Sequence, residues 1–415
     1  MEKRLLKPVV LSAMILLATT VIPPAGFAGT VAAPYQLGTW EGFRPAAISY
    51  TFDDDCPNQY AIAVPMFHAA GIKMTLFTVT SWVTSWAQVQ TAASYGDEIA
   101  SHTVTHADLP NVPPAQLTNE LASSQSIINS YITNQSCLTI AYPNCDVPNT
   151  AIVQQYYLAG RVCSGSLDGP SALTFMTLSS FILGNTGSYT NGANINALAD
   201  SAVTQGRWCV YLTHAIDGDS GYSPLSSAAL QASVNYTSTN QSKFWVETFG
   251  NVVRYIKERM SSSVTETTNT GSSITVQVTN NLDNTIYNYP ITLRRPLPAN
   301  WAAAAVTQNG QPITAQVVTL NSTNFVMFDV VPNGGDIVLT PSVLPFTLSS
   351  PTLTPPGSLT LQLNGQSNVT YTLYSSTDLL NWLPDQTTTL MGTSTNITVD
   401  ASSNSIEFYR AQWSP

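Results

Sequence analysis

Two clusters of titratable side chains have the types and spacing of a metal-dependent hydrolytic site. Three consecutive aspartates, Asp53 to Asp55, end an alternating apolar run that begins at Ala47. His102 and His106 are four residues apart, so a helix or a tight turn would place both imidazoles on one side. One carboxylate and two neutral imidazoles leave a coordination position for water, as in catalytic metal sites. The sequence therefore predicts a metal centre made from one of these carboxylates and both imidazoles.

Each ionisable group can be given a role in such a site. We predict that Asp54, His102 and His106 bind a divalent metal, with zinc favoured, although cobalt and nickel suit the same ligands. A bound cation of this kind polarises a carbonyl and lowers the pKa of a water molecule. Hydrolysis also needs a base and an acid, for which the candidates are Asp53 and His214, at the end of a late apolar strand. The alternative is a calcium loop or a solvated turn at the aspartates.

Strand and helix patterns alternate through the first 260 residues, which indicates a parallel sheet and most simply an α/β barrel. Such barrels carry their active sites at the C-terminal ends of the strands, where both clusters fall. The predicted strands are 47–52, 72–77, 97–102, 138–142 and 208–212. The predicted helices are 60–70, 86–95, one that begins at Pro113-Pro114, 150–158, 195–204 and 249–260.

The remainder of the chain has the short alternating runs and turn residues of β-structure. Residues 261–270 read as a polar linker at the start of a small β-sandwich, and prolines between residues 341 and 357 indicate a stiffer linker. The predicted domain organisation is a signal peptide at 1–28, the barrel at 29–260, a β-sandwich at 261–340, a proline-rich linker at 341–357 and an all-β module at 358–415.

The N-terminus and the composition bear on location and partners. A basic segment, an apolar run from Val9 to Ile22 and small residues before Ala28 predict a secretory signal that is cleaved after Ala28; the alternative is an uncleaved anchor. We therefore expect a secreted, periplasmic or cell-surface protein with no stable membrane insertion after cleavage. A formal net charge of −10, with 9% charged residues, offers no basic surface for nucleic acid.

Five cysteines in an exported chain permit disulfides and leave at least one thiol unpaired. Cys163 and Cys209 fall in two predicted strands, which favours that pair. Cys137 and Cys145 flank another strand and form a second candidate pair. Spacing alone does not decide between these pairings.

Residues 45–260 resemble the polysaccharide deacetylases of carbohydrate esterase family 4, which carry a NodB-type domain. The T-F-D-D-D run that ends at Asp55 is similar to the T-F-D-D-G motif of that family. The segment from His102 to His106 is similar to H-[ST]-x-x-[HD], and Leu212 with His214 is similar to L-x-H. The resemblance implies a distorted (β/α)7 barrel, Asp53 as base, Leu212 as a wall of the substrate pocket and His214 as acid.

One motif departs from the family pattern. The family often has R-x-P-[YF], in which the arginine orients the catalytic aspartate, whereas this chain has Ala141 at the arginine position, followed by Tyr142, Pro143 and Asn144. The backbone N–H of Asn144 is a candidate oxyanion donor. Arg161 is a candidate replacement for the arginine; the alternative is an ordinary structural or surface arginine. For the family's fourth motif, the possible remnants are Asp168 and Trp208, unless both belong to the scaffold.

The resemblance implies a hydrolase that acts on C–N bonds other than peptide bonds and removes acetyl groups from N-acetylglucosamine polymers. An O-acetyl esterase on xylan and a catalytically degenerate carbohydrate-binding protein are the alternatives. The expected partner is an acetylated polysaccharide or oligosaccharide. Trp82, Trp86 and Tyr142 could stack on sugar rings or serve as packing residues. The C-terminal β modules could serve sugar attachment, surface retention or secretion.

Overall fold

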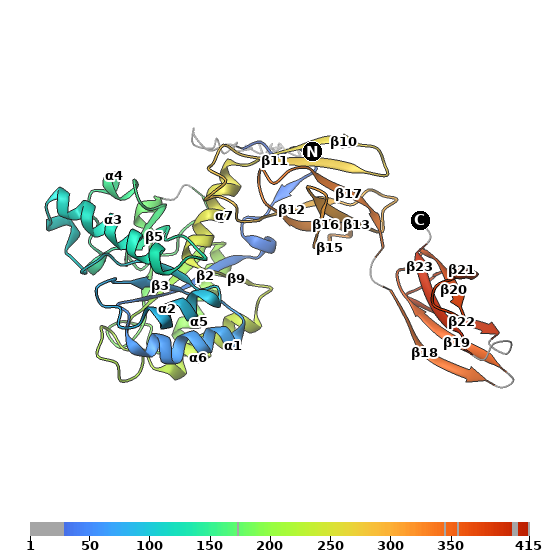
Figure 1. The fold of residues 1–415 in the computed structure, drawn as a ribbon, viewed down its shortest axis with the longest axis horizontal. Helices are drawn as coiled ribbons and strands as arrows, with labels where there is room; N and C mark the ends of the chain where they lie inside the picture. Colours follow the sequence, from blue (N-terminus) through green and yellow to red (C-terminus); the bar gives the residue numbers. More distant parts are fainter. Residues whose placement is uncertain (1–28, 172–173, 344–345, 355–356, 401–405, 414–415) are drawn as a thin grey trace, which may run out of the picture.

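The structure is a computed structural model that describes residues 29–171, 174–343, 346–354, 357–400 and 406–413. The predicted signal peptide at 1–28 lies outside the described residues. Among the residues that are described, no helix combines the length and apolarity needed to cross a bilayer. The chain forms three successive bodies along its length, an α/β body followed by two β bodies (Figure 1).

A curled parallel sheet is the framework of the first body, and it confirms the predicted distorted β/α barrel. The strands follow the order β6-β5-β4-β3-β2-β8-β7, with β9 pairing beside β2. A single bridge between Arg161 and Leu178 links β6 to the segment before β7. The strands are β2 (Ala46–Asp53), β3 (Thr75–Thr78), β4 (Glu98–Ser101), β5 (Thr139–Ala141), β6 (Ala159–Arg161), β7 (Phe181–Ile182), β8 (Trp208–Thr213) and β9 (Phe244–Val246).

Seven helices described in this body surround the sheet (Figure 1). They are α1 (Val64–Ala70), α2 (Trp86–Ser94), α3 (Pro114–Tyr131), α4 (Thr150–Val153), α5 (Gly192–Gln205), α6 (Ser227–Thr239) and α7 (Phe249–Ser261). The side chains of Asn191, Ser226 and Thr248 cap the first turns of α5, α6 and α7. The helix predicted at 150–158 is wrong in length, because α4 ends at Val153 and the chain then turns towards β6.

The second body is built from two antiparallel sheets that continue directly from α7. One sheet has the order β10-β11-β17-β13-β14 and the other has the order β1-β12-β16-β15. The strands are β1 (Gln36–Leu37), β10 (Ser263–Asn269), β11 (Ile274–Thr279), β12 (Ile291–Pro296), β13 (Ala303–Gln308), β14 (Gln311–Ile313), β15 (Ala315–Leu320), β16 (Thr323–Val330) and β17 (Ile337–Ser342).

Two segments of this body form strands that the sequence analysis did not assign to them. Residues 261–270, predicted as a linker, are mostly strand β10, whose polar side chains belong to a solvent-facing edge strand. The lead-in at 29–44, assigned to the barrel, contributes β1 to the sandwich through pairing with β12. The two bodies share one hydrophobic core, in which Trp40, Phe249 and Tyr255 pack with sandwich residues. The sandwich is therefore packed against the barrel and is not suspended from it.

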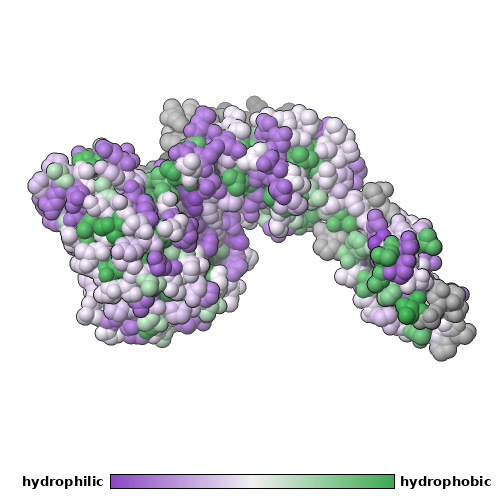
Figure 2. Space-filling model, viewed as in Figure 1, coloured by the Kyte–Doolittle hydropathy of each residue, from purple (hydrophilic) through white to green (hydrophobic). Residues whose placement is uncertain are grey.

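The third body is a smaller pair of three-stranded sheets, β18-β19-β22 and β21-β20-β23. Its strands are β18 (Thr347–Thr354), β19 (Ser358–Asn364), β20 (Thr370–Ser376), β21 (Leu383–Thr389), β22 (Ser394–Asp400) and β23 (Phe408–Trp413). The linker predicted at 341–357 is thus mainly strand β18, paired with β19. Hydrophobic groups are visible on this body in Figure 2. Leu380, in the turn between β20 and β21, is 84% exposed, and Leu383, at the start of β21, is 70% exposed.

Two buried acids, Glu258 at the junction of barrel and sandwich and Asp97 in the barrel, predict a stability that falls as the pH rises. Glu258 is fully buried on α7, accepts a hydrogen bond from Tyr289 N at 3.1 Å, and burial raises its pKa to about 8. Burial likewise raises the pKa of Asp97 to about 7. A carboxyl with a raised pKa in the folded state stabilises the fold below the pKa of the unfolded chain and loses that contribution as the pH rises through the folded pKa.

We therefore expect the metal-free protein to melt several degrees higher at pH 5 than at pH 8. Glu258→Gln, which carries no ionisable proton, should flatten this slope and raise the melting temperature at pH 8 relative to the wild type. Thermal unfolding followed by circular dichroism over that pH range measures both effects. Asp146 is exposed, so Asp146→Asn serves as the matched control. If the pH dependence of the melting temperature in Glu258→Gln equals that of the wild type, the prediction is contradicted.

Candidate metal centre

The candidate site lies where β2 ends and the chain turns sharply. Asp53 is the last residue of β2 and is 2% exposed. Asp54 and Asp55 follow with φ values of 75° and 53°, a backbone region that Asp tolerates better than most residues. Asp55, where the family motif has glycine, accepts hydrogen bonds from Tyr60 Oη at 2.9 Å and Val79 N at 2.8 Å. These bonds hold the turn and direct its first two carboxylates to one side.

The three predicted metal ligands lie together. Asp54 Oδ1 is 3.5 Å from His102 Nε2 and 3.6 Å from His106 Nε2, and one ligand atom from each residue lies within 4.8 Å of the others. Asp54 Oδ1 is buried and makes no hydrogen bond within the described part of the chain. A buried carboxylate oxygen facing two imidazole nitrogens is the donor set that a divalent transition metal needs. The residues therefore fit a metal ion.

Supporting contacts orient both imidazoles. His102 Nδ1 donates to Ala141 O at 2.9 Å, which turns Nε2 towards Asp54. The loop that carries His106 is a tight turn and not a helix, with φ of 58° at His106 itself. Glu120 on α3 holds this loop by accepting hydrogen bonds from Val104 N at 2.8 Å and Thr105 N at 2.9 Å. The ligands are thus held in place by the protein itself.

Burial and charge act against each other on the titratable groups of the site. Burial would raise the pKa of Asp54, but the adjacent imidazole of His102 and the other nearby imidazoles lower it overall. Burial opposes protonation of His102, yet the charges of Asp53 and Asp54 raise the pKa of that imidazole. For His106 and His214 burial dominates, and the pKa of each is lowered. A cation bound here would occupy the place that a proton on His102 otherwise takes.

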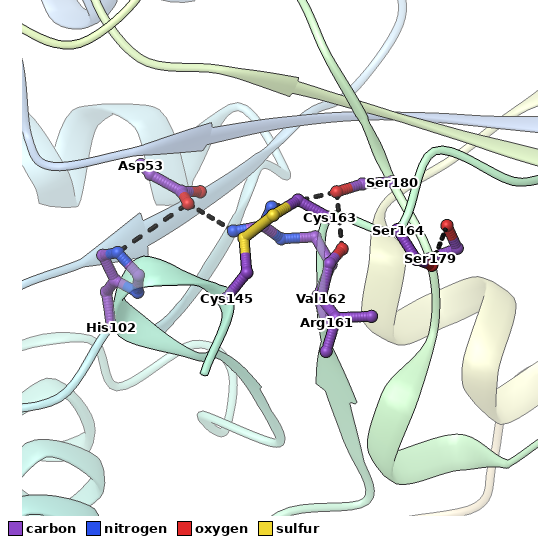
Figure 3. Close-up of a disulfide and its surroundings, with 9 residues drawn as sticks. All are labelled: Asp53, His102, Cys145, Arg161, Val162, Cys163, Ser164, Ser179 and Ser180. Atoms are coloured by element: carbon purple, nitrogen blue, oxygen red, sulfur yellow. Dashed lines mark hydrogen bonds and ion pairs between the residues drawn. A yellow bond between two sulfur atoms is a disulfide. The ribbon is translucent and has the colours of Figure 1, made fainter. Parts of the chain in front are cut away.

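The arginine that the sequence motif lacks is supplied by the neighbouring strand. In the parallel pairing of β5 with β6, Ala141 is directly opposite Arg161. The guanidinium of Arg161 is 1% exposed and forms a short ion pair with Asp53 Oδ2 (Figure 3). Ser180 Oγ accepts a second hydrogen bond from Arg161 at 3.1 Å. Arg161 is therefore a buried partner of Asp53 and not a surface arginine.

Most of the predicted site residues line one cavity of about 370 Å³. It contains Asp53 and the three predicted ligands, with His214 at the end of β8. Its remaining lining residues are Tyr142, Asn144, Cys145, Cys163, Ile182, Leu212 and Tyr222. Pro143 is buried at the start of the Asn144 turn and does not line the cavity. The aromatic ring of Tyr222 lies 5.1 Å from the imidazole of His214.

Other residues considered from the sequence lie elsewhere. Trp86 stacks on Tyr131, with ring centroids 4.2 Å apart, and offers no face to the cavity. Asp168 accepts a hydrogen bond from Ser179 N at 2.8 Å, and Trp208 is fully buried, so both belong to the scaffold. Trp82 does reach the site, where its ring stacks 5.1 Å from that of His106 and is 45% exposed.

Some residues that shape the site were not found from the sequence. The buried amide of Gln59 donates both to Asp53 O and, at 2.9 Å, to His214 O, which ties the ends of β2 and β8 together. Both candidate cysteine pairs are wrong, because the disulfide joins Cys145 to Cys163 while Cys137 and Cys209 are free buried thiols. Position before the first turn of α1 was the only signal for Gln59, and it was too weak to use.

Comparison with known proteins agrees with the resemblance to polysaccharide deacetylases. Residues 42–160 match the family model for polysaccharide deacetylases. A gellan lyase from Bacillus sp. is 26% identical over 328 residues, which is 74% of this chain and 13% of that protein. The protein YxkH of Bacillus subtilis (strain 168), whose name describes it as a polysaccharide deacetylase, is 30% identical to this chain over 98 residues. The aligned segment is 22% of this chain and 35% of YxkH. The chain thus spans only a minor part of each of these relatives.

Among solved structures, the Xyl-CE4 domain of a multidomain xylanase from the hindgut metagenome of Trinervitermes trinervoides is 20% identical. That comparison covers 50% of this chain and 88% of the solved chain, with a TM-score of 0.37. The segment that matches the polysaccharide deacetylase family therefore includes Asp53, Asp54, His102 and His106.

His106→Ala should weaken metal binding by more than about 100-fold, because loss of residues that only orient ligands already costs 10- to 100-fold. Calorimetric titration of the metal-free protein with Zn²⁺ measures this loss without any substrate. His68→Ala is the matched control, since His68 is exposed on α1 and stacks on Tyr95 with ring centroids 3.8 Å apart. Equal zinc affinity in His106→Ala and the wild type would exclude His106 as a ligand.

Proposed function

We propose that this chain is a metal-dependent deacetylase that hydrolyses acetyl groups on a polysaccharide, with N-acetylglucosamine polymers as the favoured substrate class. The observation that supports this most directly is the grouping around one cavity. A carboxylate with a buried arginine partner, Asp53, stands beside the Asp54, His102 and His106 cluster, and His214 lines the same cavity. This is the set of groups that metal-assisted hydrolysis of an amide requires.

Each residue has a role that its position supports. Asp54, His102 and His106 would hold a divalent cation, with zinc as the favoured metal, which would polarise the acetyl carbonyl and lower the pKa of a water molecule. Asp53, held by Arg161, takes the proton from the attacking water. His214 gives a proton to the departing nitrogen, and the N–H of Asn144 stabilises the negative charge on the former carbonyl oxygen.

The proposal extends to where the protein acts. The basic and apolar segments at the start of the chain favour export. The disulfide between Cys145 and Cys163 agrees with an oxidising compartment. We therefore propose a secreted, periplasmic or surface-attached enzyme.

The function is tested by incubating the zinc-loaded protein with N-acetylated chitin oligomers, peptidoglycan glycan strands and O-acetylated xylan, and measuring free acetate. Release of acetate from the N-acetylated glycans at a rate above that of the metal-stripped protein is the expected result. Release from xylan alone would assign an O-acetyl esterase. Zinc binding without acetate from any glycan would identify a carbohydrate-binding protein with lost catalysis.

The role of His214 distinguishes amide from ester substrates. An amine leaves only with a proton, so His214→Ala should slow N-deacetylation by about 10²- to 10⁴-fold. An alkoxide depends less on the acid, and the loss on an O-acetyl substrate should be smaller. Rates of acetate release from paired N-acetyl and O-acetyl oligosaccharides measure the two losses, with His68→Ala as control. An N-deacetylation rate equal to that of the wild type would exclude His214 as the acid.

A further inference from the structure

The disulfide is part of the cavity wall. Cys145 lies in the turn after β5 and Cys163 lies just after β6, and both line the same cavity as Asp53 and the metal cluster. Figure 3 draws the disulfide together with Asp53, whose carboxylate is joined by dashed lines to Arg161 and His102. A disulfide that served only to cross-link two surface segments of the barrel would not need to line the cavity.

The walls of the cavity differ in chemistry. The lining combines carboxylates and imidazoles with the disulfide and the apolar side chains of Ile182 and Leu212. Ile182 and Leu212 are paired in register on the adjacent strands β7 and β8. An acyl group at the reaction centre presents a carbonyl to the polar groups and must place its hydrocarbon end against apolar atoms. The apolar wall is the part of the cavity that fits that end.

The disulfide also sets the place of the residues on either side of it. Asn144 and Cys145 have φ values of 56° and 64°, a conformation that requires external support in residues with side chains. The bond joins this turn to the segment two residues beyond Arg161, with Cα atoms 5.7 Å apart. The wall that contacts the acyl group is therefore fixed relative to both Asn144 and Arg161.

From these observations we infer that the Cys145–Cys163 disulfide determines acyl specificity: it forms a rigid end wall that admits an acetyl group and rejects longer acyl chains. The inference rests on the proposed deacetylase function and adds the class of acyl group to it. A pocket end of this kind discriminates against each extra methylene by about tenfold or more, because a filled wall has no space for it.

The test uses the full zinc-loaded chain and three probes, 4-nitrophenyl acetate, propionate and butyrate, with the Asp53→Asn rate subtracted as background. The wild type should hydrolyse the acetate at least about tenfold faster than the butyrate, in kcat/KM. Cys145→Ala combined with Cys163→Ala removes both sulfur atoms and should raise the butyrate-to-acetate ratio about tenfold or more. Alkylation under denaturing, non-reducing conditions should label the three thiols Cys56, Cys137 and Cys209 in the wild type.

Two further variants distinguish a disulfide that fills space next to the acyl group from one that only cross-links the two segments. Cys145→Ala with Cys163→Met replaces the lost volume without the covalent bond, and it should return the ratio towards that of the wild type. Cys137→Ala removes a buried cysteine outside the cavity and should leave the ratio unchanged. Zinc titration and thermal unfolding establish whether each variant is folded. A wild-type ratio near one would overturn the inference even if a variant does not fold.

The outcomes separate this inference from the proposed function. If the wild type releases acetate from glycans but hydrolyses butyrate as fast as acetate, or if the double alanine variant keeps the wild-type ratio, the disulfide does not set specificity while the deacetylase function stands. If the wild type releases acetate from neither glycans nor aryl esters, both fail together.

Discussion

Asp53→Asn should still bind zinc but should release acetate about 10²- to 10⁴-fold more slowly than the wild type. The amide of asparagine cannot take a proton from water, and general-base catalysis contributes rate factors of this size. The proposed ligands Asp54, His102 and His106 keep their donor atoms in this variant. The loss should therefore appear in kcat while the zinc affinity stays within a few-fold of the wild type.

Zinc titration and acetate release from the same preparation measure the two quantities. Asp168→Asn is a suitable control, because Asp168 is a half-buried acid outside the cavity whose pKa burial raises to about 6. Rates should be compared below the melting temperature of each variant, since Asp53→Asn also leaves Arg161 without its charged partner. Wild-type turnover by Asp53→Asn would remove Asp53 from its proposed role as the base.

Arg161→Ala should destabilise the protein by about 3–5 kcal/mol, the usual cost of removing one partner of a buried ion pair. Asp53 and Arg161 are 2% and 1% exposed, so water cannot replace the lost partner. The variant should also slow acetate release by about 100-fold, because displacement of a catalytic group by an ångström costs that much. Arg161→Lys should keep part of the stability, since lysine provides the charge but not the bond geometry that also reaches Ser180.

A double-mutant cycle tests the pairing itself. Asp53→Asn combined with Arg161→Ala leaves neither buried charge, so the double variant should be more stable than Arg161→Ala alone. Urea unfolding of the metal-free proteins gives the free energies of unfolding. Because Arg410 is exposed, Arg410→Ala is the control for the loss of an arginine. Additive losses in the cycle would contradict a direct interaction between the two side chains.

The extent of sequence-based prediction differs between the parts of the chain. The strand predicted at 47–52 is found as β2 at Ala46–Asp53, and the helix predicted at 249–260 is found as α7 at Phe249–Ser261. Both are local patterns, in which each residue's burial follows from its own spacing along the element. The strand predicted at 72–77 begins later, at Thr75, because the residues before it connect Gly71 to the sheet. The predicted domain boundaries stay a prediction, although β1 and β18 fall within segments assigned otherwise.

The roles proposed for the site residues also stay predictions. The sequence was sufficient to expect some of the contacts in the site and insufficient for others. The order of the motifs along the chain was enough to expect that Asp54, His102 and His106 would meet, because parallel strands of a barrel end on the same rim. It was not enough to find Gln59 or Glu120, because each binds backbone groups of another element, such as His214 O for Gln59 and Val104 N for Glu120. Hydrogen bonds to distant main-chain atoms leave no pattern in a single sequence.

The amino-acid sequence by itself determined the alternation of strands and helices and which chemical groups stand at the strand ends, because these depend on neighbours a few residues apart. Only the tertiary structure decided that Arg161 reaches Asp53 from β6, since this follows from the register that pairs Ala141 with Arg161. The same holds for the bond between Cys145 and Cys163. Contacts of this kind depend on which strands become neighbours and how they are aligned, and packing of the whole sheet settles both.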